Sequence, residues 1–545
     1  MDQRVKDIIR EYQLEELKAA NWRSLYQQVA DLMLPREDQI TGQRTSGEDK
    51  SKKVYDPTAQ LDLEDMVSGL SSTFFPAGQR AFSITVKNRR LAEVEDVKTW
   101  LALAAQITHD ELYDSNFMLQ LNEVLAPVVG FGTGNLYSEW DNDRLGLNFK
   151  ARDVASYTFK QNNKGQVDAV YLKFCYTARQ AVQEFGDNAG PEVLKAVQKL
   201  ETESKVFTFI QAVRPRIARN VMLVDDLNMP FESVFVNVDE EVVVSEGGFE
   251  ELPYAVVRWK KDSSEKYGRG QGTQVLSAVK LLQQATRDWI DLANKYANPP
   301  YEVLDTFPGE VKTFPSAVNK VLQLGSIRGI GQDVLGNFPV TDQAIERLQA
   351  LVHRAFFVDV FAPLSQPQKT HVTAVEVLER VKQSMKKLAL PVYRLQCELF
   401  NPTITRCVLL LYRNYRLPMM PEVLRGQGFG IEYVGELALA MRDQQARAFQ
   451  RFAQTVMALE PVFPGVRDMI SIERALPDIA LNDGLKVEHL STKDEIAAKR
   501  QARQQELDAQ KALQLASVAT EGYQKTQKAP EGGSPAAEVM AAVGE

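Results

Sequence analysis

The chain has 545 residues, of which 44% are hydrophobic and 25% charged, and its formal net charge at pH 7 is -8. This composition is typical of a soluble globular protein with a sizeable core, and the length corresponds to roughly three or four domains. The acidic balance argues against a dedicated tight DNA-binding protein, whose binding face is usually basic. It does not exclude a protein along which DNA slides without being held.

Cysteine content and hydropathy point to a reducing compartment. The three cysteines, Cys175, Cys397 and Cys407, are scattered and form no C-x-x-C pair, so no disulfide framework is expected. The N-terminus lacks the apolar centre of a signal peptide, and no segment approaches the ~18 apolar residues of a membrane span. We therefore expect a soluble protein of the cytoplasm.

The N-terminal part of the chain is predicted to be mainly helical. An amphipathic helix fills the first thirty-odd residues and ends at Pro35, and residues 36–56 are polar and resemble a loop. The elements expected next are a helix over Ala59–Phe75, a strand over Phe82–Val86, and helices over Leu91–Asn116 and Leu119–Val129.

The central part alternates in hydropathy with a period of two, which is typical of antiparallel strands. The predicted strands are Asn135–Trp140, Tyr157–Phe159, Val167–Phe174, Phe207–Arg214, Val234–Val238, Val242–Glu246 and Tyr254–Trp259. Together with the helices they predict an α+β fold that is mostly helical.

Two long helices, over Thr273–Ala297 and Val340–Phe361, bracket about forty residues of short strand and turn signals. Each has one narrow apolar stripe, made of Val275, Val279, Leu282, Trp289, Ala293 and Tyr296 in the first and of Ile345, Leu348, Val352 and Phe356 in the second. The polar residues assigned to the outer faces are Lys280, Gln283, Gln284, Arg287, Asp288, Asp291 and Lys295, and Asp342, Glu346, Arg347, Gln349 and Arg354. Such helices suit a thin wall better than a thick core.

The C-terminal part is again predicted to be helical. A short polar loop over residues 362–372 leads into a long helix that reaches Tyr412, with kinks expected at Pro391 and Pro402. Further helical segments are expected over Gly435–Leu459, Val462–Leu481 and the charged stretch Lys493–Gln514, followed by a disordered tail rich in Pro, Gly and Ala.

Motifs for catalysis or cofactor binding are missing from the sequence. There is no P-loop and no G-x-S-x-G elbow, and no cofactor or metal site is predicted. Glycines cluster at 130–134 and 268–272, where tight turns are favoured over a phosphate cradle because neither cluster has the G-x-G-x-x-G spacing. An enzyme is therefore disfavoured, and no catalytic residue is proposed.

The four histidines do not change this interpretation, because none has a metal-ligand spacing to another His, Cys or carboxylate. His109, beside Asp110 and Glu111, is expected on a solvated helix surface. His353, on the second long helix, is expected to face a neighbour or a lumen.

Several segments, in the same order and spacing, resemble the portal or head-to-tail connector proteins of short-tailed bacteriophages. No single motif decides this, and the resemblance covers most of residues 1–480. The segments are Trp22–Tyr26, Leu63–Val86, Leu125–Glu139 with its Gly-Asn-Leu-Tyr unit, Tyr267–Gly270, and His371–Val381 with its Val-Thr-Ala-x-Glu unit.

The resemblance implies a non-catalytic ring of twelve subunits around an axial channel for double-stranded DNA. It implies contacts with a packaging motor (terminase), tail or adaptor proteins, and scaffolding and major capsid proteins, but none with a membrane. The location implied is the portal vertex of the virion, with assembly in the host cytoplasm. The regions implied are a wing (1–268), a first stem helix (269–297), a clip (298–339), a second stem helix (340–361), a channel loop (362–372), wing and crown-base helices (373–490), and a crown helix with a disordered tail (491–545).

Cations near the DNA are expected to be few, since a lumen that bound phosphates strongly would stall transport. The candidates are Lys369 and Gln368 in the channel loop, and Arg287, Lys295 and Arg354 on the stem. For the cations, the alternatives are an ordinary solvated charge or an ion pair between subunits. Alternative functions for the whole chain are another ring component of the virion, such as a tail or adaptor protein, or an enzyme with an unrecognised site.

Overall fold

The computed structural model describes residues 3–35, 39–42, 53–76, 80–92, 94–223, 225–297, 301–303, 310–312, 327–329, 338–358 and 388–433, and thirteen residues between 499 and 515. The loop at 362–372 and the helices expected over 435–459 and 462–481 lie outside these residues. The chain divides into two compact units, Met1–Ala440 and Met441–Glu545. In the second unit, the described residues are helical and exposed, as predicted for Lys493–Gln514.

The helices of the first unit follow the predicted order, with two additions after the fifth strand. The bounds are α1 (Gln3–Met33), α2 (Thr58–Phe74), α3 (Arg89–Ala92), α4 (Glu95–Asp114), α5 (Phe117–Gly130), α6 (Ala178–Phe185), α7 (Pro191–Val197), α8 (Gln271–Ala297), α9 (Phe338–Ala355) and α12 (Asn401–Arg413). The helix expected over Leu91–Asn116 is two helices, because Val94 has extended backbone angles. The additional α6 begins at a capping box formed by Thr177 and Gln180.

The strands form four antiparallel sheets in the described residues, which confirms the α+β class. The sheet orders are β1-β12, β10-β11, β3-β2-β9 and β4-β5-β6-β7-β8. The bounds are β1 (Phe82–Val86), β2 (Thr133–Asp141), β3 (Gly146–Ala151), β4 (Tyr157–Gln161), β5 (Val167–Thr177), β6 (Val206–Pro215), β7 (Phe231–Asn237), β8 (Val242–Phe249), β9 (Tyr254–Arg258), β10 (Tyr301–Val303), β11 (Ile327–Gly329) and β12 (Phe429–Tyr433).

One large apolar core joins most of the first unit. It includes buried residues of α1, α2, α4, α5, α8, α9 and α12, and α5 lies at its centre with Leu121, Val124 and Val128 fully buried. Because this core continues from the N-terminal helices to β12, the first 440 residues form one compact unit rather than several domains.

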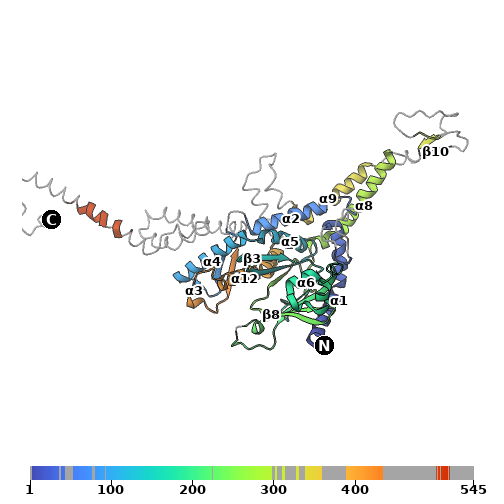
Figure 1. The fold of residues 1–545 in the computed structure, drawn as a ribbon. Helices are drawn as coiled ribbons and strands as arrows, with labels where there is room; N and C mark the ends of the chain where they lie inside the picture. Colours follow the sequence, from blue (N-terminus) through green and yellow to red (C-terminus); the bar gives the residue numbers. More distant parts are fainter. Residues whose placement is uncertain are drawn as a thin grey trace, which may run out of the picture. The chain divides into compact units, whose positions relative to one another are not determined.

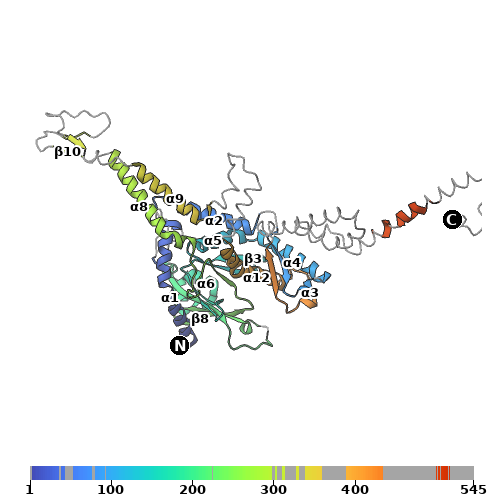
Figure 2. The same cartoon turned by 180° about the vertical axis from the view of Figure 1, so that it is seen from behind.

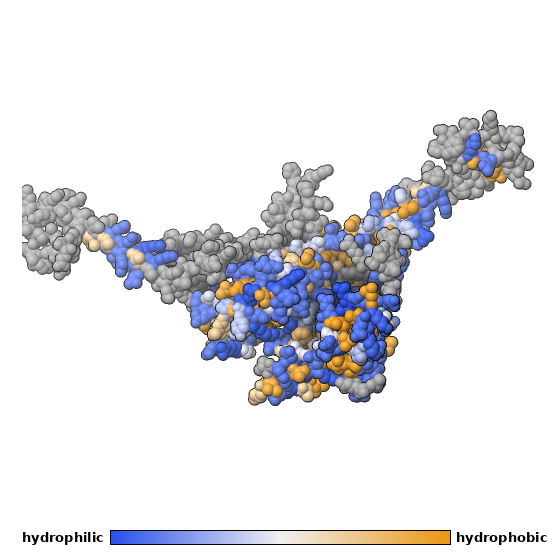
Figure 3. All heavy atoms as spheres, in the orientation of Figure 1, coloured by the Kyte–Doolittle hydropathy of each residue, from blue (hydrophilic) through white to orange (hydrophobic). Residues whose placement is uncertain are grey.

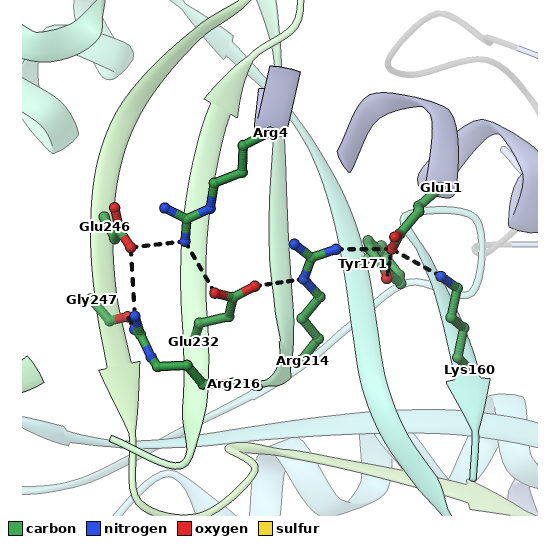
Figure 4. A network of polar contacts seen from close by, with 9 residues as sticks. All are labelled: Arg4, Glu11, Lys160, Tyr171, Arg214, Arg216, Glu232, Glu246 and Gly247. Carbon is green, nitrogen blue, oxygen red and sulfur yellow. Dashed lines mark hydrogen bonds and ion pairs between the residues drawn. The ribbon is translucent and has the colours of Figure 1, made fainter. Parts of the chain in front are cut away.

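A network of ion pairs attaches helix α1 to the five-stranded sheet, and positive and negative side chains alternate along it. The network runs through Lys160, Glu11, Arg214, Glu232, Arg4, Glu246 and Arg216, as Figure 4 shows. Glu232 accepts from Arg214 at 2.6 Å and from Arg4 at 3.0 Å. Burial disfavours ionisation of Glu11, but hydrogen bonds from Tyr171 and Lys160 outweigh it and hold the pKa of Glu11 below its ordinary value.

Proline shapes the helical segment before β12. Just before Pro402, where a kink was expected, the structure has a π-helix over Leu395–Phe400, in which the N–H of Asn401 donates to the carbonyl of Gln396, five residues earlier. Pro402 has no N–H for the bond to the carbonyl of residue 398, so the change of register occurs where that bond is missing. The described residues 388–394 are helical through Pro391.

Candidate functional site

Helices α8 and α9 form an antiparallel pair that lies side by side in both views, with its base among α1, α2 and α5 (Figures 1 and 2). The predicted apolar stripe of α9 is confirmed, and that of α8 is confirmed in its first half, whereas Trp289 and Ala293 are only half-buried. Val275, Val279 and Leu282 are buried on α8, and Val352 and Phe356 are buried on α9. The second helix ends at Ala355, earlier than the expected Phe361, and Phe357 just beyond it has a left-handed backbone with a φ of 56°.

The N-terminus of α8 is set against the end of α5 by direct backbone contact between the two glycine clusters. The N–H of Gly270 donates to the carbonyl of Phe131 at 3.1 Å, and the N–H of Trp259 donates to the carbonyl of Gly132 at 2.9 Å. A Cβ atom on Gly270 would lie 2.7 Å from the nitrogen of Gly132, which real Cβ atoms essentially never approach. Both clusters therefore need glycine for this contact.

These glycines hold protein backbone and are not arranged as a phosphate cradle. The prediction of a tight turn is confirmed at Gly132, whose φ is 103°. No local pattern indicated that the two clusters contact each other. Thr133 completes the junction, because its side-chain oxygen accepts the N–H of Gly268 at 3.0 Å and lies 3.3 Å from the hydroxyl of the buried Tyr26.

A pair of glutamines ties the helix pair to the segment before α2. Buried Gln283 accepts the N–H groups of Tyr55 and Asp56 at 2.6 and 2.9 Å and donates to the carbonyl of Asp56 at 2.7 Å. Gln349 on α9 donates to the carboxylate of Asp56 at 2.8 Å. The assignment of Gln283 and Gln349 to outer, solvated faces was wrong, because a buried backbone segment that lacks its own partners requires polar groups pointing inward.

His353 and Asp62 form a second polar link, between α9 and α2. The Nδ1 atom of His353 lies 2.8 Å from Oδ1 of Asp62, whose side chain is only 5% exposed. Burial raises the pKa of Asp62, and the contact with His353 offsets only part of this effect. The expectation that His353 faces a neighbour or a lumen missed this partner within the chain.

The expectation for His109 was also wrong. Its side chain is only 14% exposed, and its ring lies 4.6 Å from that of Tyr113 and 6.2 Å from that of Phe82. The adjacent Asp110 is exposed, so the charged residues beside His109 in the sequence were a poor guide to its own environment. His109 thus belongs to the packing between α4 and β1.

An open groove of about 410 Å³ runs between α8, α1 and the segment at Lys53–Tyr55. Its lining residues are Gln28, Asp31, Leu32, Lys53, Tyr55, Lys280, Gln283, Gln284 and Arg287. Lys53 pairs with Asp31 at 2.7 Å, Lys280 donates to Gln28 at 2.6 Å, and the guanidinium of Arg287 lies 5.8 Å from the ring centre of Tyr55. With three cations and one carboxylate, this lining is basic.

Comparison with known sequences decides the family. The family described as "Bacteriophage head to tail connecting protein" matches residues 6–487 of this chain. The chain belongs to this family. Being a head-to-tail connecting protein, it is a structural component of the virion and not an enzyme.

Two curated proteins are similar to this connecting protein over nearly their whole length. The portal protein of Salmonella phage epsilon15 is 24% identical over 520 residues, which cover 94% of this chain and 93% of the relative. The probable portal protein of Bordetella phage BPP-1 is 24% identical over 508 residues, which cover 92% of this chain and 91% of the relative.

The structure describes three of the five candidate channel residues. Arg287, Lys295 and Arg354 are exposed on the helix pair, Arg287 in the groove and Arg354 near the end of α9. Gln368 and Lys369 lie outside the described residues. Among described residues, no cluster of three or more metal-ligating side chains occurs, and no described helix is long and apolar enough to span a membrane.

Proposed function

We propose that copies of this chain assemble into a ring around an axial channel at one vertex of the capsid. Double-stranded DNA enters through this channel during packaging and leaves through it during ejection. The observation that carries the proposal is the α8–α9 pair, in a chain that belongs to the head-to-tail connecting family.

The helix pair has the surface expected of a wall segment. Each helix buries one apolar stripe against its partner and the base of the unit, and most of its exposed residues are polar or charged, apart from Leu281, Ile290 and Leu351. Figure 3 accordingly shows a mainly hydrophilic surface on the described part of the pair. Identical copies standing side by side would form a thin cylinder with a water-facing inner surface.

The described elements suggest how the regions of the subunit divide. We assign α8 and residues 340–361, most of which belong to α9, to the stem, and residues 298–339, which include the antiparallel strands β10 and β11, to the clip. The wing comprises residues 1–268 with parts of 373–490, residues 362–372 form the channel loop, and residues 491–545 form the crown. In this assignment the two glycine clusters form the junction between wing and stem.

The charge balance supports a channel that guides DNA rather than binding it. DNA carries one charge per ~1.7 Å of helix axis, so a strongly basic lumen would hold the phosphates and stop transport. The whole chain has a net charge of -8, so it carries no overall excess of positive charge that would hold the phosphates. We assign Lys369 and Gln368 in the channel loop, and the exposed Lys295 and Arg354 on the stem, as the few side chains that contact DNA.

The partners follow from the position of the ring. The clip receives the packaging motor (terminase) and later the tail or adaptor proteins, and the motor supplies ATP hydrolysis. Scaffolding and major capsid proteins surround the wing during assembly in the host cytoplasm, and twelve copies form the ring.

Negative-stain electron microscopy of the purified full chain tests the proposal. End-on class averages should show rings with an axial hole, and side views should show a narrow stem. A chain that stays monomeric at high protein concentration, and also when scaffolding and capsid proteins are added, would contradict it.

A further inference from the structure

Two cations of the groove beside α8, Lys280 and Arg287, form no ion pair with a carboxylate among the described residues. Lys280 donates only to the amide of Gln28, and Arg287 contacts the ring of Tyr55. Lys53 is already paired with Asp31. The two unneutralised cations lie seven residues, or about two helical turns, apart, so they share one face of α8.

A complementary charge stands on α9. Asp342 and Glu346 are both exposed, and their spacing of four residues places them next to each other on one face of the helix. Within the described part of the chain, neither makes an ion pair or a side-chain hydrogen bond. The pair of helices thus presents an unpaired basic face and an unpaired acidic face.

The hydrogen bond from Gln271 to the carbonyl of Ala355, at 3.0 Å, sets the register of these faces. Lys280 follows Gln271 by nine residues, and Glu346 precedes Ala355 by nine. At 1.5 Å per residue, both lie about 14 Å along the pair from that bond. Nine residues are also two and a half turns, so Lys280 points away from the side of α8 on which Gln271 reaches α9, and the exposed Glu346 lies off the buried stripe of α9.

We propose that the basic groove on α8 of one copy receives the acidic face of α9 of the next copy, with Lys280 and Arg287 against Glu346 and Asp342. This inference rests on the proposed ring. A head-to-tail ring requires two different, complementary surfaces on each copy. Rotation about an axis along the helix pair brings residues of equal height together, and the opposite charges are at nearly equal height.

The assignment moves Arg287 from the list of channel residues to the contact between subunits. Tyr55 and Gln283 support the same face, since both line the groove and are joined by a hydrogen bond. Such exposed charge pairs add little affinity each, but they fix register and exclude wrong alignments. The groove therefore aligns neighbouring stems.

The test uses two charge reversals in the full chain, K280E/R287E on the basic face and D342K/E346K on the acidic face. Ring formation is followed by analytical ultracentrifugation across protein concentrations. Each variant alone should need at least about tenfold more protein for half-assembly, because like charges meet at every interface. A 1:1 mixture of the two should recover assembly, since alternating copies make every interface complementary again.

Recovery in the mixture is the decisive result, because a contact within one chain cannot be repaired by another copy. The charge reversal R347E, on the other exposed side of α9, is the control and should assemble like the wild type. Circular dichroism and the thermal midpoint should show that all variants are folded.

Normal assembly of both reversed variants would overturn the inference, as would a mixture that stays unassembled. If the variants assemble but particles built with K280E/R287E contain less DNA, the groove contacts DNA instead of a neighbouring copy. If the wild type itself forms no ring under any condition, the proposed function fails together with this inference. A wild type that forms rings alongside unaffected variants overturns the inference alone.

Discussion

The backbone of Gly132 lies directly against the backbone of Gly270, at the point where the chain leaves β9 and enters α8. The two residues come from separate glycine clusters, and each occupies space that a side chain on the other would need. This contact positions the base of the helix pair on the sheet β3-β2-β9 and on the end of α5.

Replacing Gly132 with alanine should lower the free energy of unfolding by about 2–4 kcal/mol. Its φ of 103° strains any residue with a Cβ, and the added atom would overlap the backbone of Arg269 and Gly270. Denaturant unfolding of the full chain measures the loss. Gly247→Ala is the control, because a Cβ there meets nothing within 4 Å, and its midpoint should not change. Equal midpoints for both variants would contradict the role of the junction.

Replacing Gln283 with alanine should cost about 2–4 kcal/mol, since it leaves the backbone N–H groups of Tyr55 and Asp56 and a carbonyl without their partner. Gln284→Ala removes the neighbouring glutamine, whose amide donates to Asp288 on the same exposed face. That control should change stability by less than about 0.5 kcal/mol. The difference in thermal midpoint between the two variants checks this. A Gln283→Ala protein as stable as its control would show that the clamp contributes nothing.

Asp62→Asn should flatten one part of the dependence of stability on pH. The folded-state pKa of Asp62 is raised, so the folded protein binds its proton more tightly than the unfolded chain does. The stabilisation from this site is therefore present at low pH and is lost as pH rises through the folded-state pKa. The quantity to measure is the difference in unfolding midpoint between variant and wild type from pH 4 upward. This difference should shift in favour of the variant as pH rises, and a constant difference would exclude a contribution from Asp62.

Glu232→Gln should destabilise the attachment of α1 to the sheet by about 2–4 kcal/mol, because Arg214 and Arg4 lose their shared, largely buried carboxylate. Glu192→Gln is the matched control, since Glu192 pairs with Lys195 on the exposed surface and the variant should show no change in midpoint. Hydrogen exchange of the α1 amides locates the effect. Unchanged protection in α1 would mean that the network does not hold the helix.

Lys369→Glu tests the proposed channel loop. Reversing a cation that contacts DNA should change the amount of DNA packaged or retained in particles while leaving ring formation intact. Lys164→Glu, an exposed lysine in the β4–β5 turn, is the control and should leave DNA content unchanged. Particles with wild-type DNA content in the Lys369→Glu variant would remove this residue from the set that contacts DNA.

Hydrophobic periodicity predicted most of the elements, because each strand or helix repeats its own pattern locally. The strand over Phe82–Val86 was predicted with its observed bounds, and the stripe of α8 was correct for Val275, Val279 and Leu282. The same method placed Gln283 and Gln349 outside. A polar residue is assigned to a solvent-exposed face unless its distant partner is known. The partner of Gln283 is Asp56, which lies 227 residues away in the sequence.

For the same reason, local sequence patterns could not predict the long-range pairings at the candidate site. Nothing near His353 indicates that it meets Asp62, which lies 291 residues earlier. Each glycine cluster was predicted to form a tight turn, but the contact between the two clusters depends on how α5 and β9 are arranged. The family resemblance supplied an expected order of regions, which stays a prediction, and the structure added contacts between segments that lie far apart in the sequence.

The junction at Gly132 and Gly270 holds the sheet β3-β2-β9 and the helix α8 together through direct backbone contact. Arg258, the last residue of β9, is held by Glu398 at 2.8 Å, and the whole of β9 pairs with β2 over five consecutive residues. A force on α8 would therefore be transmitted to β9, to β2 and to the π-helical turn that carries Glu398. We therefore expect a mechanical load at the far end of the helix pair to be transmitted to the body of the subunit, because the base of α8 is held by these contacts.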